Sequence, residues 1–253
     1  YGGIITLDRN YYGLGTKYTK NSIFENRKRT LVFGIDHLNQ SDDRRRYKNE
    51  FGAKGEITLD QKEQFKTTGV YLLNQASYSS GLLLRYGIRY DINNIGIHSD
   101  FVKLDKLNPS FGLSYSVSSR DNIFFSFGTS FETPTLNELS NNPNGTLCPS
   151  TCPKLPSYNE ELKSNSSQNY EIGWRKSSSN LIIEAVAYIT NSNNEILPFE
   201  LEQFPGKNFY RNVGSTLRKG IELSSQFFFN RGKLNLSYTL SKNEFKDFEI
   251  DDA

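Results

Sequence analysis

Methionine is absent from the 253 residues, and no positively charged start precedes an apolar stretch. Neither an initiator nor a signal peptide is therefore visible, and we expect the chain to be an internal piece of a longer protein. No stretch approaches the roughly 20 consecutive apolar residues that a membrane-spanning helix needs, which excludes helical spans. With two histidines and no nucleophile triad, phosphate loop or paired metal motif, the sequence predicts no enzyme, no metal site and no covalently bound cofactor.

Cysteine is also scarce. Cys148 and Cys152 stand together in C-P-S-T-C, within a stretch rich in Pro, Asn and Ser. Paired cysteines in an exposed loop suit an oxidising compartment, so we expect a local disulfide. Free thiols and a metal clip are the alternatives, although two thiolates fall short of a four-ligand zinc site. The net charge of +2 is too small to indicate nucleic acid or anionic lipid as a partner.

What the sequence has instead is a repeated hairpin pattern. Between residues 81 and 92 apolar and polar side chains alternate, so that a pleated sheet would send them to opposite faces. The mean hydropathy of −0.61 is low, as expected if only alternate residues of each strand face lipid. This pattern indicates an all-β fold, an antiparallel transmembrane β-barrel segment without any helix.

About ten strands are predicted, each longer than the five or six residues usual in globular sheets. Their ranges are 4–19, 30–40, 65–78, 81–92, 107–118, 122–131, 166–177, 180–191, 214–229 and 232–242. Short turns are expected on the periplasmic side, with 20–29 as a longer one, and long outer loops are expected at 41–64, 93–106, 132–165 and 192–213. The inward faces carry small and polar residues, which suit a wide, hydrated or plugged lumen.

Three stretches resemble the TonB-dependent outer-membrane receptors, which import ferric siderophores, ferric citrate, haem and related ligands. Residues 126–139, S-F-G-T-S-F-E-T-P-T-L-N-E-L, resemble a strand leading into F-x-x-P-T-x-x-E-L; N-Y-E-I-G at 169–173 and N-V-G followed by G-I-E-L at 212–223 match in order and spacing. The motif residues are Phe131, Pro134, Thr135, Glu138, Leu139, Asn169, Tyr170, Glu171, Gly173, Asn212, Gly214, Gly220 and Glu222. The run N-E-E-L-K-S-N at 159–165 departs from the family pattern because it lacks both prolines.

The resemblance implies that residues 1–253 form the middle-to-late part of a 22-stranded barrel, with the N-terminal plug and the first and last strands outside this chain. It implies an integral protein of the bacterial outer membrane, which contacts lipid and lipopolysaccharide. It also implies coupling through the plug to the TonB-ExbB-ExbD complex, and an iron chelate as the transported ligand.

The motifs have expected structural roles. Pro134 has no amide hydrogen, so the strand should end near Thr133. Gly173, Gly214 and Gly220 are expected to allow bulges or the close approach of a plug. Four charged residues are expected on inward faces, paired with neighbouring strands or with the plug rather than with ligand: Glu171, Arg175, Arg218 and Glu222.

Ligand contacts are expected on the outer loops. Arg44, Arg45 and Arg46, followed by Tyr47, would bring three guanidinium groups together for an anionic chelate. The alternative is a solvated segment or one that contacts lipopolysaccharide. His98 is a further candidate, as a haem receptor would use a loop histidine. Three functions are compared: a receptor for a ferric chelate, a passive porin or structural barrel, and a soluble β-rich domain whose apolar faces would pack on one another.

Overall fold

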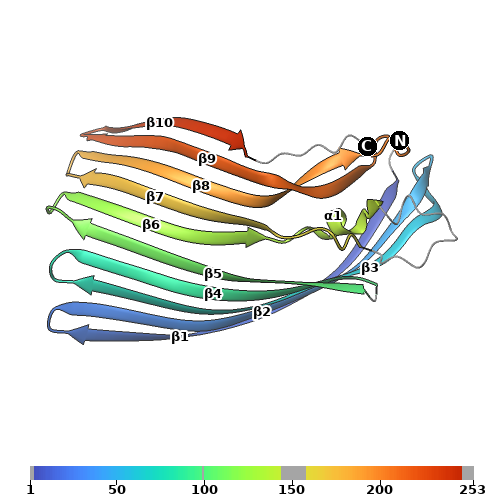
Figure 1. Cartoon of the computed structure of the whole chain (residues 1–253), viewed down its shortest axis with the longest axis horizontal. Helices are drawn as coiled ribbons and strands as arrows, with labels where there is room; N and C mark the ends of the chain where they lie inside the picture. Colours follow the sequence, from blue (N-terminus) through green and yellow to red (C-terminus); the bar gives the residue numbers. More distant parts are fainter. Residues whose placement is uncertain (1–2, 99, 144–157, 247–253) are drawn as a thin grey trace.

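The computed structural model describes residues 3–98, 100–143 and 158–246, which form one curved, ten-stranded antiparallel sheet (Figure 1). Each strand is hydrogen-bonded to the next in the sequence, from β1 at one edge to β10 at the other. The strands are β1 Ile4–Phe24, β2 Arg27–Glu50, β3 Ala53–Tyr78, β4 Leu82–Ile97, β5 Asp100–Ser116, β6 Asp121–Glu132, β7 Asn165–Ser177, β8 Leu181–Glu200, β9 Asn208–Phe229 and β10 Gly232–Phe245. The predicted all-β fold with ten antiparallel strands is confirmed.

The strand register joins the apolar alternation of every strand into one continuous surface, the apolar belt. One row of paired residues runs Leu113, Phe125, Ile172, Ala187, Ile221 and Leu240 from β5 to β10. These side chains are not covered by a second layer of the described residues, and Ile172, for example, is 63% exposed. The packing that a soluble sandwich requires is therefore not found, and the belt is free to contact hydrocarbon.

Three of the four segments predicted to be outer loops are mostly β-strand, so these predictions are wrong. Strands β2 and β3 continue through most of 41–64 and meet at a tight turn, where Phe51 and Gly52 both have positive φ angles. Likewise 93–106 and 192–213 are mostly strand, and the turn expected at 20–29 shrinks to residues 25 and 26. Outside the membrane both faces of a strand meet water or polar groups, so the apolar alternation disappears while the backbone hydrogen bonds continue.

The fourth loop contains the short helix α1, Leu136–Ser140, where the sequence predicted no helix. Strand β6 ends at Glu132, close to the expected position before Pro134. Thr135 then caps the helix: its Oγ1 accepts from the amide of Glu138 at 3.3 Å, and the Glu138 carboxylate accepts from the amide of Thr135 at 2.7 Å. This reciprocal pair starts the helix. Among the described residues, no helix is long and apolar enough to span a membrane.

The inner-wall glycines are positions of close approach rather than bulges. The register runs unshifted through Gly173 and Gly220 and on both sides of Gly214, and the register shifts lie near Tyr47 instead. A Cβ on Gly173 would lie 2.3 Å from the ring of Phe124, and one on Gly220 would lie 2.8 Å from the Tyr188 hydroxyl. Aromatic rings of neighbouring strands thus occupy the space beside Gly173 and Gly220. The predicted bulges are wrong, and the alternative, close approach of a plug, stays a prediction.

Candidate functional site

Between β6 and β7, residues 133–143 and 158–164 lie over the inner face of the sheet, the face opposite the apolar belt, near the end away from the short turns (Figure 1). Leu139 of α1 and Leu162 are 1% and 2% exposed and pack against Ile95 and Ile97 of β4. Partly buried apolar residues surround them: Phe65, Val102, Leu104, Leu136, Tyr158, Ile196 and Tyr210. We call this apolar cluster the mouth core; it connects β4 with β9 across the concave face of the sheet. We call the surrounding region the outer mouth.

Two asparagines fix the returning half of this segment. The Asn159 amide donates to the carbonyl of Leu139 at 2.7 Å, and its side chain donates to the carbonyl of Tyr210 at 3.3 Å. On β9, Asn212 Nδ2 donates to the carbonyls of Lys163 and Asn194 at 2.9 and 2.8 Å, while Oδ1 accepts from the Lys163 amide at 2.7 Å. The ends of two motif stretches, at Leu139 and Asn212, are therefore brought to the same end of the sheet, whereas the 169–173 stretch lies in the wall on β7.

A groove of about 410 Å³ lies between this returning segment and strands β8 and β9. Asn159, Lys163, Phe199, Tyr210 and Arg211 are among its lining residues. The Arg211 guanidinium lies 5.1 Å from the centre of the Phe199 ring. Cationic groups beside aromatic rings can hold an anion that also has flat apolar parts.

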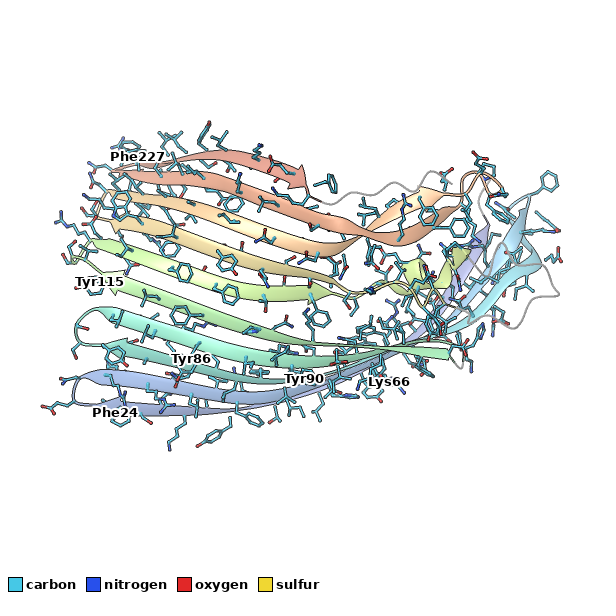
Figure 2. The ribbon with its side chains drawn as sticks, in the orientation of Figure 1. Phe24, Lys66, Tyr86, Tyr90, Tyr115 and Phe227 are labelled. Carbon is cyan, nitrogen blue, oxygen red and sulfur yellow. The ribbon has the colours of Figure 1, made fainter. Side chains whose placement is uncertain are left out.

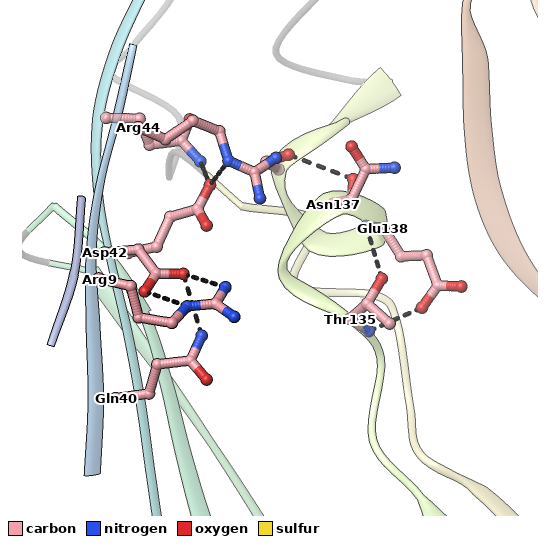
Figure 3. A network of polar contacts seen from close by, with 10 residues as sticks. Arg9, Gln40, Asp42, Arg44, Thr135, Asn137 and Glu138 are labelled. Carbon is pink, nitrogen blue, oxygen red and sulfur yellow. Dashed lines mark hydrogen bonds and ion pairs between the residues drawn. The ribbon is translucent and has the colours of Figure 1, made fainter. Parts of the chain in front are cut away.

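A buried charge network occupies the inner face of β1, β2 and β3 on the other side of α1 (Figure 3). Asp42 accepts from Arg9 Nε and Nη2 at 2.8 and 2.7 Å, and from Gln40 at 2.9 Å. Glu63 accepts from Gln61 at 2.9 Å. Both carboxyl side chains are 1% exposed, so their charges depend on these partners.

The pKa values of the two carboxyl groups in this network are shifted in opposite directions. The hydrogen bonds from Arg9 lower the pKa of Asp42 below its ordinary value. Burial raises the pKa of Glu63, although Arg44 Nε lies 3.1 Å from Glu63 Oε1. That contact lacks hydrogen-bond geometry, and within the described part of the chain Arg44 Nε and Glu63 Oε2 have no hydrogen-bond partner. Burial therefore outweighs the ion pair at Glu63.

The predicted arginine cluster does not form. Arg44 to Tyr47 lie in the outer part of β2, where alternation sends Arg44 inward to Glu63 and Arg45 outward to Asp60, at 3.3 Å. Arg46 is exposed, and the Tyr47 ring faces the Lys54 ammonium at 4.9 Å. His98 is exposed in the tight β4–β5 turn with a φ of 56°, and its amide donates to the carbonyl of Lys62. The grouping was wrong because a strand, not a loop, carries these residues.

The inner-wall motif residues form polar contacts between strands. Glu171 accepts from Asn169 at 2.6 Å and from Ser126 at 3.2 Å, and the Tyr170 ring lies 5.0 Å from that of Phe127 on the outer face. Arg175 pairs with Glu184 and Arg218 with Glu195, which confirms two of the predicted neighbouring-strand pairs. Glu222 is exposed on the inner wall, opposite Val186 and Thr239. The predicted disulfide between Cys148 and Cys152 falls outside the described residues.

Sequence reasoning missed most residues of the outer mouth. Asp42 and Glu63 lie in a stretch where polar residues fill both faces, so nothing marks them as buried. The helix had a readable signal, because Thr135 and Glu138 have the spacing of a capping box. Asn159 and Leu162 were visible only as part of a motif, and their contacts with β9 and the mouth core required the structure.

The fold, a curved antiparallel sheet with an exposed apolar belt on its outer face, is that of part of a β-barrel wall. The sequence matches the family described as TonB dependent receptor-like, beta-barrel, over residues 2–253. The chain therefore belongs to the TonB-dependent receptor family, within its barrel region, and this is a family of receptors and transporters rather than of enzymes.

Solved structures of the same architecture include two transporters and one receptor. The ferric citrate transporter FecA, in its unliganded form, has a TM-score of 0.72 at 16% identity, covering 98% of this chain and 38% of that one. BauA, the ferric preacinetobactin receptor of Acinetobacter baumannii, has 0.70 at 12% identity, covering 96% and 38%. The copper transporter OprC has 0.70 at 16% identity, covering 94% and 38%. At these identities the likeness shows the fold, and the chain spans well under half of each structure.

Proposed function

We propose that the protein containing this chain is an integral outer-membrane receptor that imports a ferric chelate, such as a siderophore or ferric citrate, by TonB-coupled active transport. Membership of the receptor family over residues 2–253 carries the proposal. Two structural neighbours are named for ferric ligands, and the exposed apolar belt supports a place in the membrane. Energy would come from the TonB-ExbB-ExbD complex through a plug outside this chain. A passive porin or structural barrel is the alternative.

The groove of the outer mouth is where we place the ligand. Lys163 and Arg211 would face the carboxylate or catecholate oxygens of the chelate, and Phe199 and Tyr210 would contact its flat parts. Of the residues predicted from the sequence, Arg46 and His98 are exposed at the same end of the sheet, and we propose them as peripheral contacts.

Uptake in whole cells tests the proposal. A strain that lacks the gene should lose growth on one ferric chelate of a panel and should lose uptake of its radioactive iron, and removal of TonB should have the same effect. Combined Lys163→Gln and Arg211→Gln should weaken binding, whereas Arg231→Gln, in the short turn at the other end of β9, is the matched control. Unchanged uptake of every iron source without the protein would contradict iron transport, and copper salts in the panel test that cargo.

A further inference from the structure

Outward-facing lysines stand just above the apolar belt on β3 and β5. Lys66 is paired in register with Asn94 of β4, and Asn94 with Lys103 of β5, so the three residues form one row on the outer face. Both lysines are exposed, and neither ammonium group has an ion pair with any residue that the structure describes. This row of Lys66, Asn94 and Lys103, which we call the lysine strip, therefore carries two positive charges and no acidic residue.

The height of this row coincides with the polar boundary of a bilayer. Lys66 lies twelve positions from Tyr78, at the turn end of β3, and Lys103 thirteen positions from Ser116, at the turn end of β5. Strands rise about 3.3 Å per residue and tilt by about 35–45° in such barrels, so twelve positions climb roughly 30 Å. That is about the thickness of the hydrocarbon layer. Figure 2 shows Tyr86, Tyr90 and Lys66 following one another away from the turns.

The nearest acidic side chain on this face of β5 has a partner of its own. Asp105, two positions from Lys103 on the same face, accepts from the Tyr90 hydroxyl at 2.7 Å. Lys62, further from the belt, is paired in register with Asp43. His37 lies one row nearer the belt, and its Nδ1 is 2.9 Å from the Thr68 hydroxyl. The ammonium groups of Lys66 and Lys103 therefore remain available to an external anion.

We propose that Lys66 and Lys103, with the Asn94 amide between them, bind the headgroup of an outer-leaflet lipid that carries two phosphate groups. Two strand spacings separate the lysine backbones by about 10 Å, which gives each phosphate its own cation. The acyl chains of the same lipid would lie on the apolar belt directly below, along Ile88 and Leu72. The inference rests on the membrane placement in the proposed function and is independent of which ligand is transported.

Native mass spectrometry of the purified full-length protein with a bis-phosphorylated glycolipid tests this site. Lys66→Gln combined with Lys103→Gln should weaken binding by roughly 25-fold, about fivefold for each lysine. Lys66→Arg with Lys103→Arg should bind like the wild type. The control pair, Lys20→Gln with Lys176→Gln, neutralises two outward lysines near the short turns and should leave binding unchanged. Heat-modifiable gel mobility confirms that each variant has a folded barrel.

A second arm uses the same lipid after removal of its phosphates, which should bind the wild-type protein as weakly as the bis-phosphorylated lipid binds the double variant. Equal binding of both lipids, or equal losses in the test and control pairs, would overturn the site. Iron uptake is measured in parallel. Loss of lipid binding with full uptake supports the lipid site alone, whereas an uptake failure in the wild type counts only against the transported cargo.

Discussion

The side chain of Asn212 pairs with the backbone of Lys163 through two hydrogen bonds, one donated by Nδ2 at 2.9 Å and one accepted by Oδ1 at 2.7 Å. An asparagine on β9 thereby substitutes for a neighbouring strand at the point where the folded-back segment rejoins the sheet. Its third bond, to the carbonyl of Asn194, satisfies a residue with a φ of 60°.

Replacing Asn212 with alanine should release this segment. Two exposed hydrogen bonds to the Lys163 backbone are lost, each worth about 0.5–1.5 kcal/mol. Hydrogen exchange of residues 158–163 should accelerate while that of β7 and β8 is unchanged. Asn191→Ala on β8 removes an amide that makes no side-chain hydrogen bond with a described residue, and it should have no such effect.

Helix α1 should depend on its cap. Thr135→Ala removes the oxygen that accepts from the Glu138 amide, which costs about 1 kcal/mol at a helix start. Leu139 should then leave the mouth core part of the time, and limited proteolysis should cut faster near α1. Asn137→Ala changes an exposed residue of the same helix and should preserve the wild-type cleavage rate; equal rates in the two variants would show that the cap is unimportant.

The charge network should make the outer ends of β1–β3 sensitive to pH. Because the pKa of Asp42 is lowered, its stabilisation is present above the ordinary aspartate value of about 4 and is lost as the pH falls through the lower, folded value. Asp42→Asn should therefore destabilise these strand ends near neutral pH, with a gap to the wild type that narrows in acid.

The contribution of Glu63 to stability has the opposite pH dependence, because its pKa is raised in the folded protein. It is fully present below the ordinary glutamate pKa of about 4.3 and is lost as the pH rises through the pKa of the folded state. Glu63→Gln should flatten that decline. Protease susceptibility of the β2–β3 hairpin, followed between about pH 3 and pH 8, measures both effects. Parallel pH profiles for the two variants would contradict the assignment.

The inner wall should accept a methyl group at some glycines and not at others. Gly173→Ala places a Cβ 2.3 Å from the Phe124 ring, and such overpacking costs about 1–3 kcal/mol. Gly128→Ala, on the adjacent strand, meets no atom within 4 Å. The fraction of heat-modifiable, folded barrel in urea should fall for the first variant and stay near the wild-type value for the second.

Neighbouring residues on β10 test which face meets lipid. Leu236 belongs to the apolar belt, and Ser237 points to the inner face. An arginine on the lipid face costs about 2–4 kcal/mol near the middle of the bilayer. Leu236→Arg should therefore reduce the yield of folded barrel in membranes, while Ser237→Arg should not. The reverse order would place the membrane on the wrong side of the sheet.

The sequence predicted the membrane-spanning part of the fold well, because lipid on one face and water on the other impose a period-two pattern. It failed where that contrast ends. From Asp42 to Glu63 the strands continue in surroundings that are polar on both faces, so they looked like a loop. The five residues of α1 are too few to show the hydrophobic periodicity of a helix. The only sequence signal for this helix is the capping-box spacing of Thr135 and Glu138.

The candidate site was predicted less well for a related reason. Arg44, Arg45 and Arg46 are adjacent in the sequence, but strand geometry turns consecutive side chains apart, so adjacency gave a false cluster. The actual outer mouth combines residues separated by more than a hundred positions, such as Ile97 and Tyr210. Such contacts follow from sheet curvature and from the fold-back of α1, neither of which a local pattern contains.

The unpaired sides of β1 and β10 determine how this chain can be handled in the laboratory. Each presents a row of amide and carbonyl groups with no strand beside it among the described residues. Such borders recruit further strands, from other copies if nothing else is available. Produced in isolation, residues 1–253 should therefore form insoluble multimers. Reliable biochemistry will require the complete, closed barrel.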